Sequence, residues 1–158
     1  RNGAKPGDVV YVSGHIGDAI LGVIENDAAA RTARHQWRPH FEEAEALALL
    51  GHVSSAMDIS DGLLKDASRL AHASMVGIEI ESGAVPVSDF YRQRLGDDKD
   101  AAMTGGEDYV LLFTAAQGLP PPISAFRIGR CIQGQDVFVD GVRTAPAGFD
   151  HFSAELSV

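Results

Sequence analysis

A short run in the middle of the chain, Met57–Leu63, combines two carboxylates and a hydroxyl where a buried strand is expected to give way to a helix. The start of a helix presents unbonded backbone amides and a partial positive charge, which suit a phosphate group. Carboxylate oxygens are ligands that magnesium prefers, so Asp58 and Asp61, three positions apart, could hold that ion against the phosphate. Ser60 lies between them and is expected to face the nucleotide that carries the phosphate.

The same run has a simpler interpretation, which the spacing leaves open. Ser and Asp are among the most frequent helix caps, so Ser60 or Asp61 could do no more than cap the helix, with Asp58 as the polar end of the strand. One polar side chain is enough for a cap, and this run has three. The excess favours a ligand site.

A second run, Thr104–Tyr109, joins two glycines to two acidic residues just before an apolar strand expected at 110–113. Glycine lets the backbone approach a ligand closely or adopt a positive φ. Glu107 and Asp108 would then place carboxylates at the mouth of that strand. Taken alone, the run is more typical of a glycine turn with two solvated acids.

The closing run, Gly148–Phe152, places two aromatic residues and a histidine after an alanine-proline stretch. Aromatic rings in such a position could cover a flat heterocycle, or they could pin the tail of the chain onto the core. The pinning role is favoured for Phe152, and both roles stay open for Phe149.

Helical and extended patterns are interspersed along the chain, so we expect an α+β fold in which a mixed β-sheet is covered by helices. The expected strands are 8–13, 53–59, 76–81, 109–114, 126–131 and 137–139, with a hairpin turn following at 140–141. The expected helices are 18–26, 39–50, 88–95 and one that starts after Ser60 or Asp61 and includes Ala71.

Length and composition limit the possible functions. With 158 residues, 45% of them hydrophobic, the chain has the size and apolar content of one domain, residues 1–158. A formal charge of -9 argues against a nucleic-acid surface, and it requires divalent cations if an acidic site is to hold a polyphosphate. No apolar run approaches the roughly 20 residues that span a bilayer, and the single Cys131 cannot form an internal disulfide. We therefore expect a cytoplasmic protein that does not contact a membrane.

Four runs along the chain resemble the thiamine-monophosphate kinase family, within the aminoimidazole ribonucleotide synthetase-like superfamily. In chain order they are Gly3–Asp8, Met57–Leu63, Gly105–Tyr109 and Gly148–Phe152. The resemblance implies the α+β carboxy-terminal domain of a two-domain subunit, whose amino-terminal domain would precede Arg1 and is absent from this chain. In the family, that absent domain forms a homodimer and supplies most of the magnesium ligands.

The resemblance also implies a role for each matching residue: Asp58 as a magnesium ligand, Ser60 as an ATP contact, Asp61 as a ligand of another magnesium, Glu107 as a contact to thiamine phosphate, and Phe149 as a second substrate contact. The implied reaction transfers the γ-phosphoryl group of ATP to thiamine monophosphate, giving thiamine diphosphate and ADP. No general base is expected, because the attacking atom is already an anionic phosphate oxygen. Two alternatives are another ATP-dependent enzyme of the superfamily and a non-catalytic ligand-binding domain with the same fold.

Overall fold

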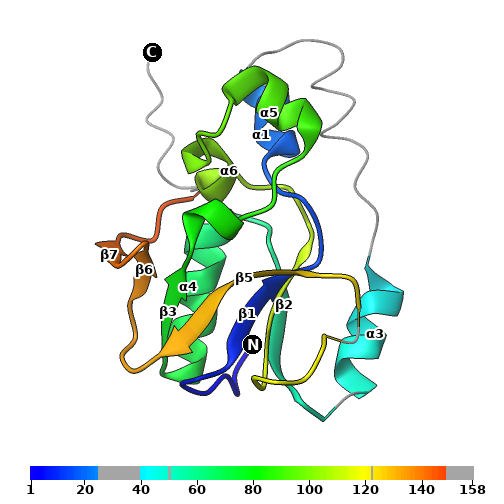
Figure 1. Cartoon of the computed structure of the whole chain (residues 1–158), viewed down its shortest axis with the longest axis vertical. Helices are drawn as coiled ribbons and strands as arrows, with labels where there is room; N and C mark the ends of the chain where they lie inside the picture. The colour runs from blue at the N-terminus through cyan, green and yellow to red at the C-terminus, as the bar shows by residue number, and fades with distance from the viewer. Residues whose placement is uncertain (25–39, 50, 122, 149–158) are drawn as a thin grey trace, which may run out of the picture.

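A computed structural model describes residues 1–24, 40–49, 51–121 and 123–148. Within these ranges seven strands form one sheet, with helices packed against it and beyond one of its ends (Figure 1). The strands are β1 (Val9–Val12), β2 (Val53–Asp58), β3 (Gly77–Ile80), β4 (Leu111–Ala115), β5 (Phe126–Ile132), β6 (Val137–Val139) and β7 (Val142–Thr144). The helices are α1 (Asp18–Ile24), α3 (Phe41–Leu49), α4 (Leu63–Ser74), α5 (Asp89–Leu95) and α6 (Asp100–Thr104), with a 3-10 turn η1 (Ser82–Ala84).

The sheet is mixed, with the strand order β2-β4-β1-β5-β3-β6-β7. Its pairings are antiparallel except that of β3 with β6. Successive side chains of a strand point to opposite faces, and β4 shows this division. Leu112 joins the apolar cluster that contains the buried residues of α4, whereas Leu111 and Phe113 pack with Leu47 of α3. The expected α+β fold, a mixed sheet covered by helices, is confirmed.

Helix α4 is fixed on the sheet by an apolar stripe. Its buried apolar positions recur every three or four residues: Leu63, Leu64, Ala67, Leu70 and Ala71. Burying one leucine contributes about 2 kcal/mol, so this stripe is a major part of the core. The helix ends where Met75 adopts the left-handed conformation (φ 56°) and its N–H bonds the carbonyl of His72. No described helix, α4 included, is long and apolar enough to cross a membrane.

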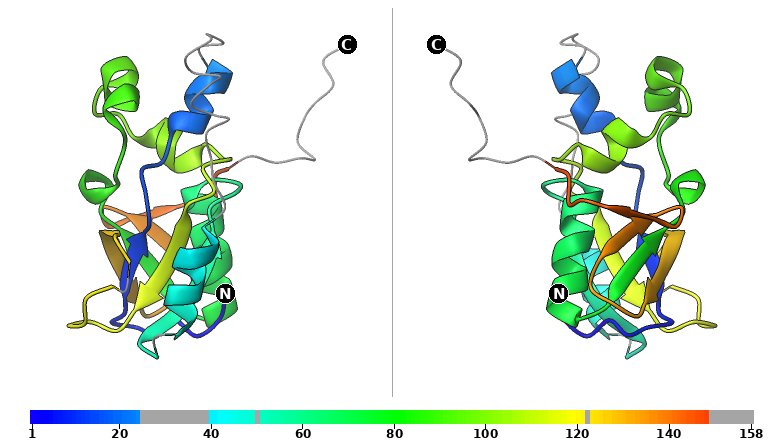
Figure 2. Two further views of the ribbon diagram at one scale, coloured as in Figure 1. Left: turned by 90° about the vertical axis from the view of Figure 1, so that its right-hand side faces the viewer. Right: turned by 90° about the vertical axis from the view of Figure 1, so that its left-hand side faces the viewer.

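Helices α1, α5 and α6 gather beyond the end of the sheet at which β1 and β2 finish and β4 begins, at the top of Figures 1 and 2. Helix α5 starts where the sequence predicted, because Ser88 Oγ accepts a hydrogen bond from the Tyr91 amide (3.0 Å). The Tyr91 hydroxyl donates to the Asp98 carbonyl (3.0 Å) and accepts from the Ala102 amide (3.1 Å). This buried ring therefore ties α5 to α6.

Candidate functional site

The two acidic runs meet at that end of the sheet. Antiparallel pairing of β2 with β4 continues beyond the strands, where the Tyr109 amide donates to the Ile59 carbonyl (2.8 Å) and the Ile59 amide donates to the Val110 carbonyl (2.8 Å). One step further, the Glu107 amide donates to the Ser60 carbonyl (2.9 Å). The predicted nucleotide contact and the predicted substrate contact are thus joined by a backbone hydrogen bond.

Glycine makes this close approach possible. A Cβ atom on Gly106 would lie 2.5 Å from the Ser60 carbonyl oxygen and 3.2 Å from the Asp61 Cα atom. A Cβ atom on Gly62, whose φ is +120°, would lie 2.8 Å from the Thr104 carbonyl oxygen. Only a residue without a side chain fits at either point. The glycines of the two runs are therefore needed to bring the runs together.

Replacing Gly106 with alanine should lower the free energy of unfolding by about 1–3 kcal/mol, because the added methyl must push the two runs apart. Urea denaturation of the chain measures the change. Gly83→Ala is the matched control, since nothing lies within 4 Å of the position of its Cβ atom. Equal unfolding free energies for the two variants would contradict the close approach.

The closing run also reaches this place. A Cβ atom on Gly148 would lie 2.5 Å from the Asp61 carbonyl oxygen and 2.7 Å from the Lys65 Cβ atom. Gly148, the first residue of the closing run, therefore packs against the Met57–Leu63 run and the start of α4. Phe149, the second predicted substrate contact, lies outside the described residues, as does the rest of the chain to Val158.

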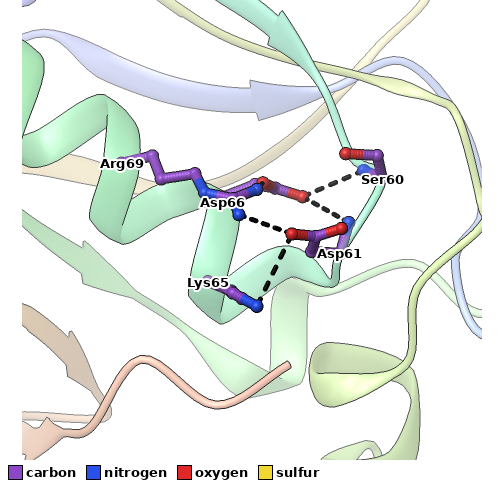
Figure 3. A network of polar contacts seen from close by, with 5 residues as sticks. All are labelled: Ser60, Asp61, Lys65, Asp66 and Arg69. Atoms are coloured by element: carbon purple, nitrogen blue, oxygen red, sulfur yellow. Dashed lines mark hydrogen bonds and ion pairs between the residues drawn. The ribbon is translucent and has the colours of Figure 1, made fainter. Parts of the chain in front are cut away.

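The turn at Ser60 and Asp61 is held by a buried carboxylate on α4 (Figure 3). Asp66 Oδ2 accepts hydrogen bonds from the Ser60 and Asp61 amides, both at 2.9 Å. Neither Ser60 nor Asp61 caps the helix, because the N-cap residue is Gly62 and no side-chain cap bond is formed. The capping interpretation is therefore wrong. The Ser60 and Asp61 amides, which precede the helix, donate to Asp66 and are therefore occupied.

The Asp61 carboxylate contacts two cations of α4. Its Oδ2 accepts from Arg69 Nη2 (2.5 Å) and lies 3.6 Å from Lys65 Nζ. The partial burial of Asp61 tends to raise its pKa, but the hydrogen bond and charge of Arg69 and the charge of Lys65 outweigh this effect and lower the pKa. Asp61 is thus held as a carboxylate anion. The spacing of the first run indicates Asp61 but not its two partners, which lie one and two turns along α4.

Asp58 has different surroundings. It is the half-buried last residue of β2, opposite Leu111 of β4. It borders a cavity of about 440 Å³, lined by residues of β2 and of α3, including Ala44 and Leu47. The two predicted metal ligands therefore face different neighbours, because Asp58 borders this cavity and Asp61 contacts α4.

The second run is strained on both sides of Asp108. Glu107 and Tyr109 have φ values of 68° and 53°, which residues other than glycine rarely adopt. Between them, Asp108 Oδ1 accepts from the Gly17 amide (2.9 Å), and its Oδ2 is buried without a hydrogen-bond partner among the described residues. Burial raises the pKa of Asp108 to about 7, although backbone hydrogen bonds from Gly17 and Ala19 act in the opposite direction. Asp108 thus anchors the run to the start of α1.

A magnesium ion would find suitable donor atoms here, but not a complete site. The carboxylates of Asp58 and Asp61 are the hard oxygen ligands that magnesium takes. Across the part of the chain that the structure describes, no group of three or more His, Cys, Asp or Glu residues could hold a metal ion. Asp58 and Asp61 therefore fit magnesium as separate carboxylate ligands, and magnesium commonly takes its other ligands from water and substrate phosphates.

The family model for the AIR synthase related protein, C-terminal domain, matches residues 5–119. The chain therefore belongs to the AIR synthase related family that this model describes. Within that family it is similar to thiamine-monophosphate kinases. The kinase of Aquifex aeolicus is 36% identical over 165 residues, and the match covers 96% of this chain and 54% of that protein. The kinase of Pyrococcus abyssi is 32% identical, and the match covers 100% of this chain and 54% of that protein.

Solved structures agree with this assignment. A structure described as AaThiL complexed with AMPPCP and TMP has a TM-score of 0.80 at 35% identity, covering 96% of this chain and 53% of that one. The hydrogenase maturation protein HypE of E. coli has a TM-score of 0.63 at 22% identity, which shows a shared fold alone. The resemblance to thiamine-monophosphate kinase is confirmed, and the chain spans about half the length of these relatives.

Proposed function

We propose that the complete protein to which this chain belongs transfers the γ-phosphoryl group of ATP to thiamine monophosphate, giving thiamine diphosphate and ADP. The observation that carries the proposal is the match, over 96% of this chain, to a structure solved with AMPPCP and TMP. AMPPCP is an analogue of ATP, and TMP is thiamine monophosphate, so that structure holds an analogue of the phosphoryl donor together with the acceptor. The two acidic runs, joined between Ser60 and Glu107, supply the polar groups that such reactants need.

Each candidate residue has a part in this reaction. Ser60 contacts the nucleotide, while Glu107 and Phe149 contact thiamine phosphate. Asp58 and Asp61 would hold magnesium, which supplies charge neutralisation between two polyanions when it is bound. The acceptor oxygen is already anionic, so the protein has to align the reactants and does not have to remove a proton. An acidic site fits this task because cations bind between it and the phosphates.

We further propose that residues 1–158 are the carboxy-terminal domain of a two-domain subunit that acts in the cytoplasm. The chain covers only 54% of the Aquifex aeolicus relative, and its described residues contain no group of three or more His, Cys, Asp or Glu side chains that could hold a metal ion. The remaining ligands would come from an amino-terminal domain, through which the complete protein forms a homodimer. The site would then be shared, with this chain as one wall.

The complete protein, incubated with ATP, magnesium and thiamine monophosphate, should form thiamine diphosphate and ADP in equal amounts. The chain of residues 1–158 should give no detectable turnover under the same conditions, because it lacks most of the metal ligands. Chromatography of both products measures the outcome. Failure of the complete protein to form thiamine diphosphate would refute the kinase. Turnover by residues 1–158 alone would refute the shared site.

A further inference from the structure

Asp66 is a charged residue in the core that the proposed chemistry does not use. Its side chain is fully buried, with 0% exposure. A buried carboxylate is costly unless it is hydrogen-bonded and paired with a charge. Both oxygens of Asp66 meet this requirement, because Oδ2 accepts from two backbone amides and Oδ1 accepts from Arg69 Nη1 (2.6 Å).

The choice of partners separates this arrangement from an ordinary helix cap. A capping residue flanks the helix and accepts from amides inside its first turn, whereas Asp66 lies inside α4 and accepts from amides that precede the helix. Those amides belong to Ser60 and Asp61, the predicted nucleotide contact and the predicted metal ligand. One carboxylate therefore sets the backbone position of two site residues.

Arg69 holds the side chain of Asp61 in a similar way. Its guanidinium places Nη1 on Asp66 (2.6 Å) and Nη2 on Asp61 (2.5 Å), so it bridges the two carboxylates. Lys65 contacts the same Asp61 oxygen from 3.6 Å. A guanidinium is a rigid planar fork, whereas a lysine ammonium is a single point of charge that cannot reproduce such a bridge reliably. Figure 3 shows Asp66 and Arg69 on α4, with the Ser60–Asp61 turn to their right.

We infer that Asp66 and Arg69 are positioning residues of the phosphoryl-transfer site, in which Asp66 fixes the Ser60–Asp61 turn and Arg69 orients the Asp61 carboxylate. This inference rests on the proposed function. Transfer between two phosphates depends on alignment, and a displacement of about 1 Å can cost 100-fold in rate. Residues that hold the ligands of a metal typically change metal affinity or activity by about 10- to 100-fold when they are replaced.

The test uses Asp66→Asn and Arg69→Lys in the complete protein. Asparagine keeps the size of Asp66 and one acceptor oxygen, but its amide group would face the guanidinium of Arg69. Lysine keeps the charge of Arg69 and loses the bridge. Asp136→Asn is the matched control, because it breaks an exposed pair with Arg143 (2.8 Å). Calorimetry of AMPPCP binding at a series of magnesium concentrations provides a measurement that does not depend on turnover.

Both variants should bind AMPPCP about 10- to 100-fold more weakly at low magnesium, with kcat reduced by a similar factor. Added magnesium should restore part of both losses, because it compensates for a poorly oriented ligand. A purely structural defect would lower the melting temperature without this rescue. The control should behave as the wild type does in binding and in turnover.

Wild-type magnesium dependence and affinity in both variants would overturn the inference, and so would a loss that magnesium does not restore. If Asp66→Asn fails to fold, Arg69→Lys decides alone, since Arg69 is 40% exposed and tolerates replacement more readily. A different result would refute the proposed kinase activity. Wild-type protein that binds AMPPCP with magnesium but forms no thiamine diphosphate would refute the kinase, and the binding data would still test the two positioning residues.

Discussion

Replacing Asp61 with asparagine in the complete protein is expected to lower kcat by about 100- to 1,000-fold, the usual cost of removing one group that stabilises transition-state charge. Asparagine has nearly the same shape and lacks the negative charge that a magnesium ion requires. Asp58→Asn should have an effect of the same order. A steady-state assay of thiamine diphosphate formation at saturating ATP and magnesium measures both.

The stability of the Asp61→Asn variant should change far less. Asp61 pairs with Arg69, and the two side chains are 16% and 40% exposed; ion pairs that remain in contact with solvent contribute only about 0–1 kcal/mol. Arg69 also keeps its second partner, Asp66, in the variant. Urea denaturation under the assay conditions separates the two effects. Asp89→Asn is a suitable control, because the Asp89 side chain is 91% exposed. Equal turnover in the Asp61 and Asp89 variants would refute the role of Asp61 as a metal ligand.

Much of the fold could be predicted from local patterns. The expected strand at 53–59 is β2 (Val53–Asp58), and the expected apolar face of the following helix is the buried face of α4. These predictions succeed because a buried strand or helix face leaves its own period in the sequence. Helix α6 (Asp100–Thr104) was missed, since five residues are too few to establish a helical period.

The sheet order could not be predicted in the same way. β1 lies between β4 and β5, two strands that follow it by about 100 residues in the chain. Such pairings are non-local, and the residues of a strand do not indicate which other strand will pair with it. The backbone contact between Ser60 and Glu107 depends on one of them, the pairing of β2 with β4. The meeting of the two runs is therefore a property of the fold.

The candidate site shows the same limit at the level of single side chains. Spacing identified the polar residues of the turn but assigned the wrong helix cap, because Asp66 holds the turn from inside α4. A signal for Asp66 was present. It is an acidic residue among the buried apolar positions of α4, between Leu64 and Ala67. A charge on a core-facing position requires a partner nearby, and the polar turn that precedes the helix supplies it.

Asp108 is expected to make the free energy of unfolding of the chain depend on pH. Burial raises its pKa from the ordinary value of 3.8 to about 7 in the folded chain, and the charge of Asp18 acts in the same direction. Between these two values the folded chain binds a proton that the unfolded chain has released. The free energy of unfolding therefore falls as the pH rises from about 4 to about 7, by up to about 1.4 kcal/mol per pH unit from this group.

Asp108→Asn should remove this part of the pH dependence, because asparagine does not titrate and can still accept the Gly17 hydrogen bond through Oδ1. Its absolute stability at pH 5 should be lower than that of the wild type, since the new amide N–H groups are buried where Oδ2 has no partner among the described residues. The difference should then shrink or reverse towards pH 8. Urea denaturation at pH 5, 6, 7 and 8 tests the slope, with Asp89→Asn as an exposed control. Parallel pH profiles for wild type and Asp108→Asn would show that Asp108 is already ionised in the folded protein at pH 5, and that its burial does not shift its titration.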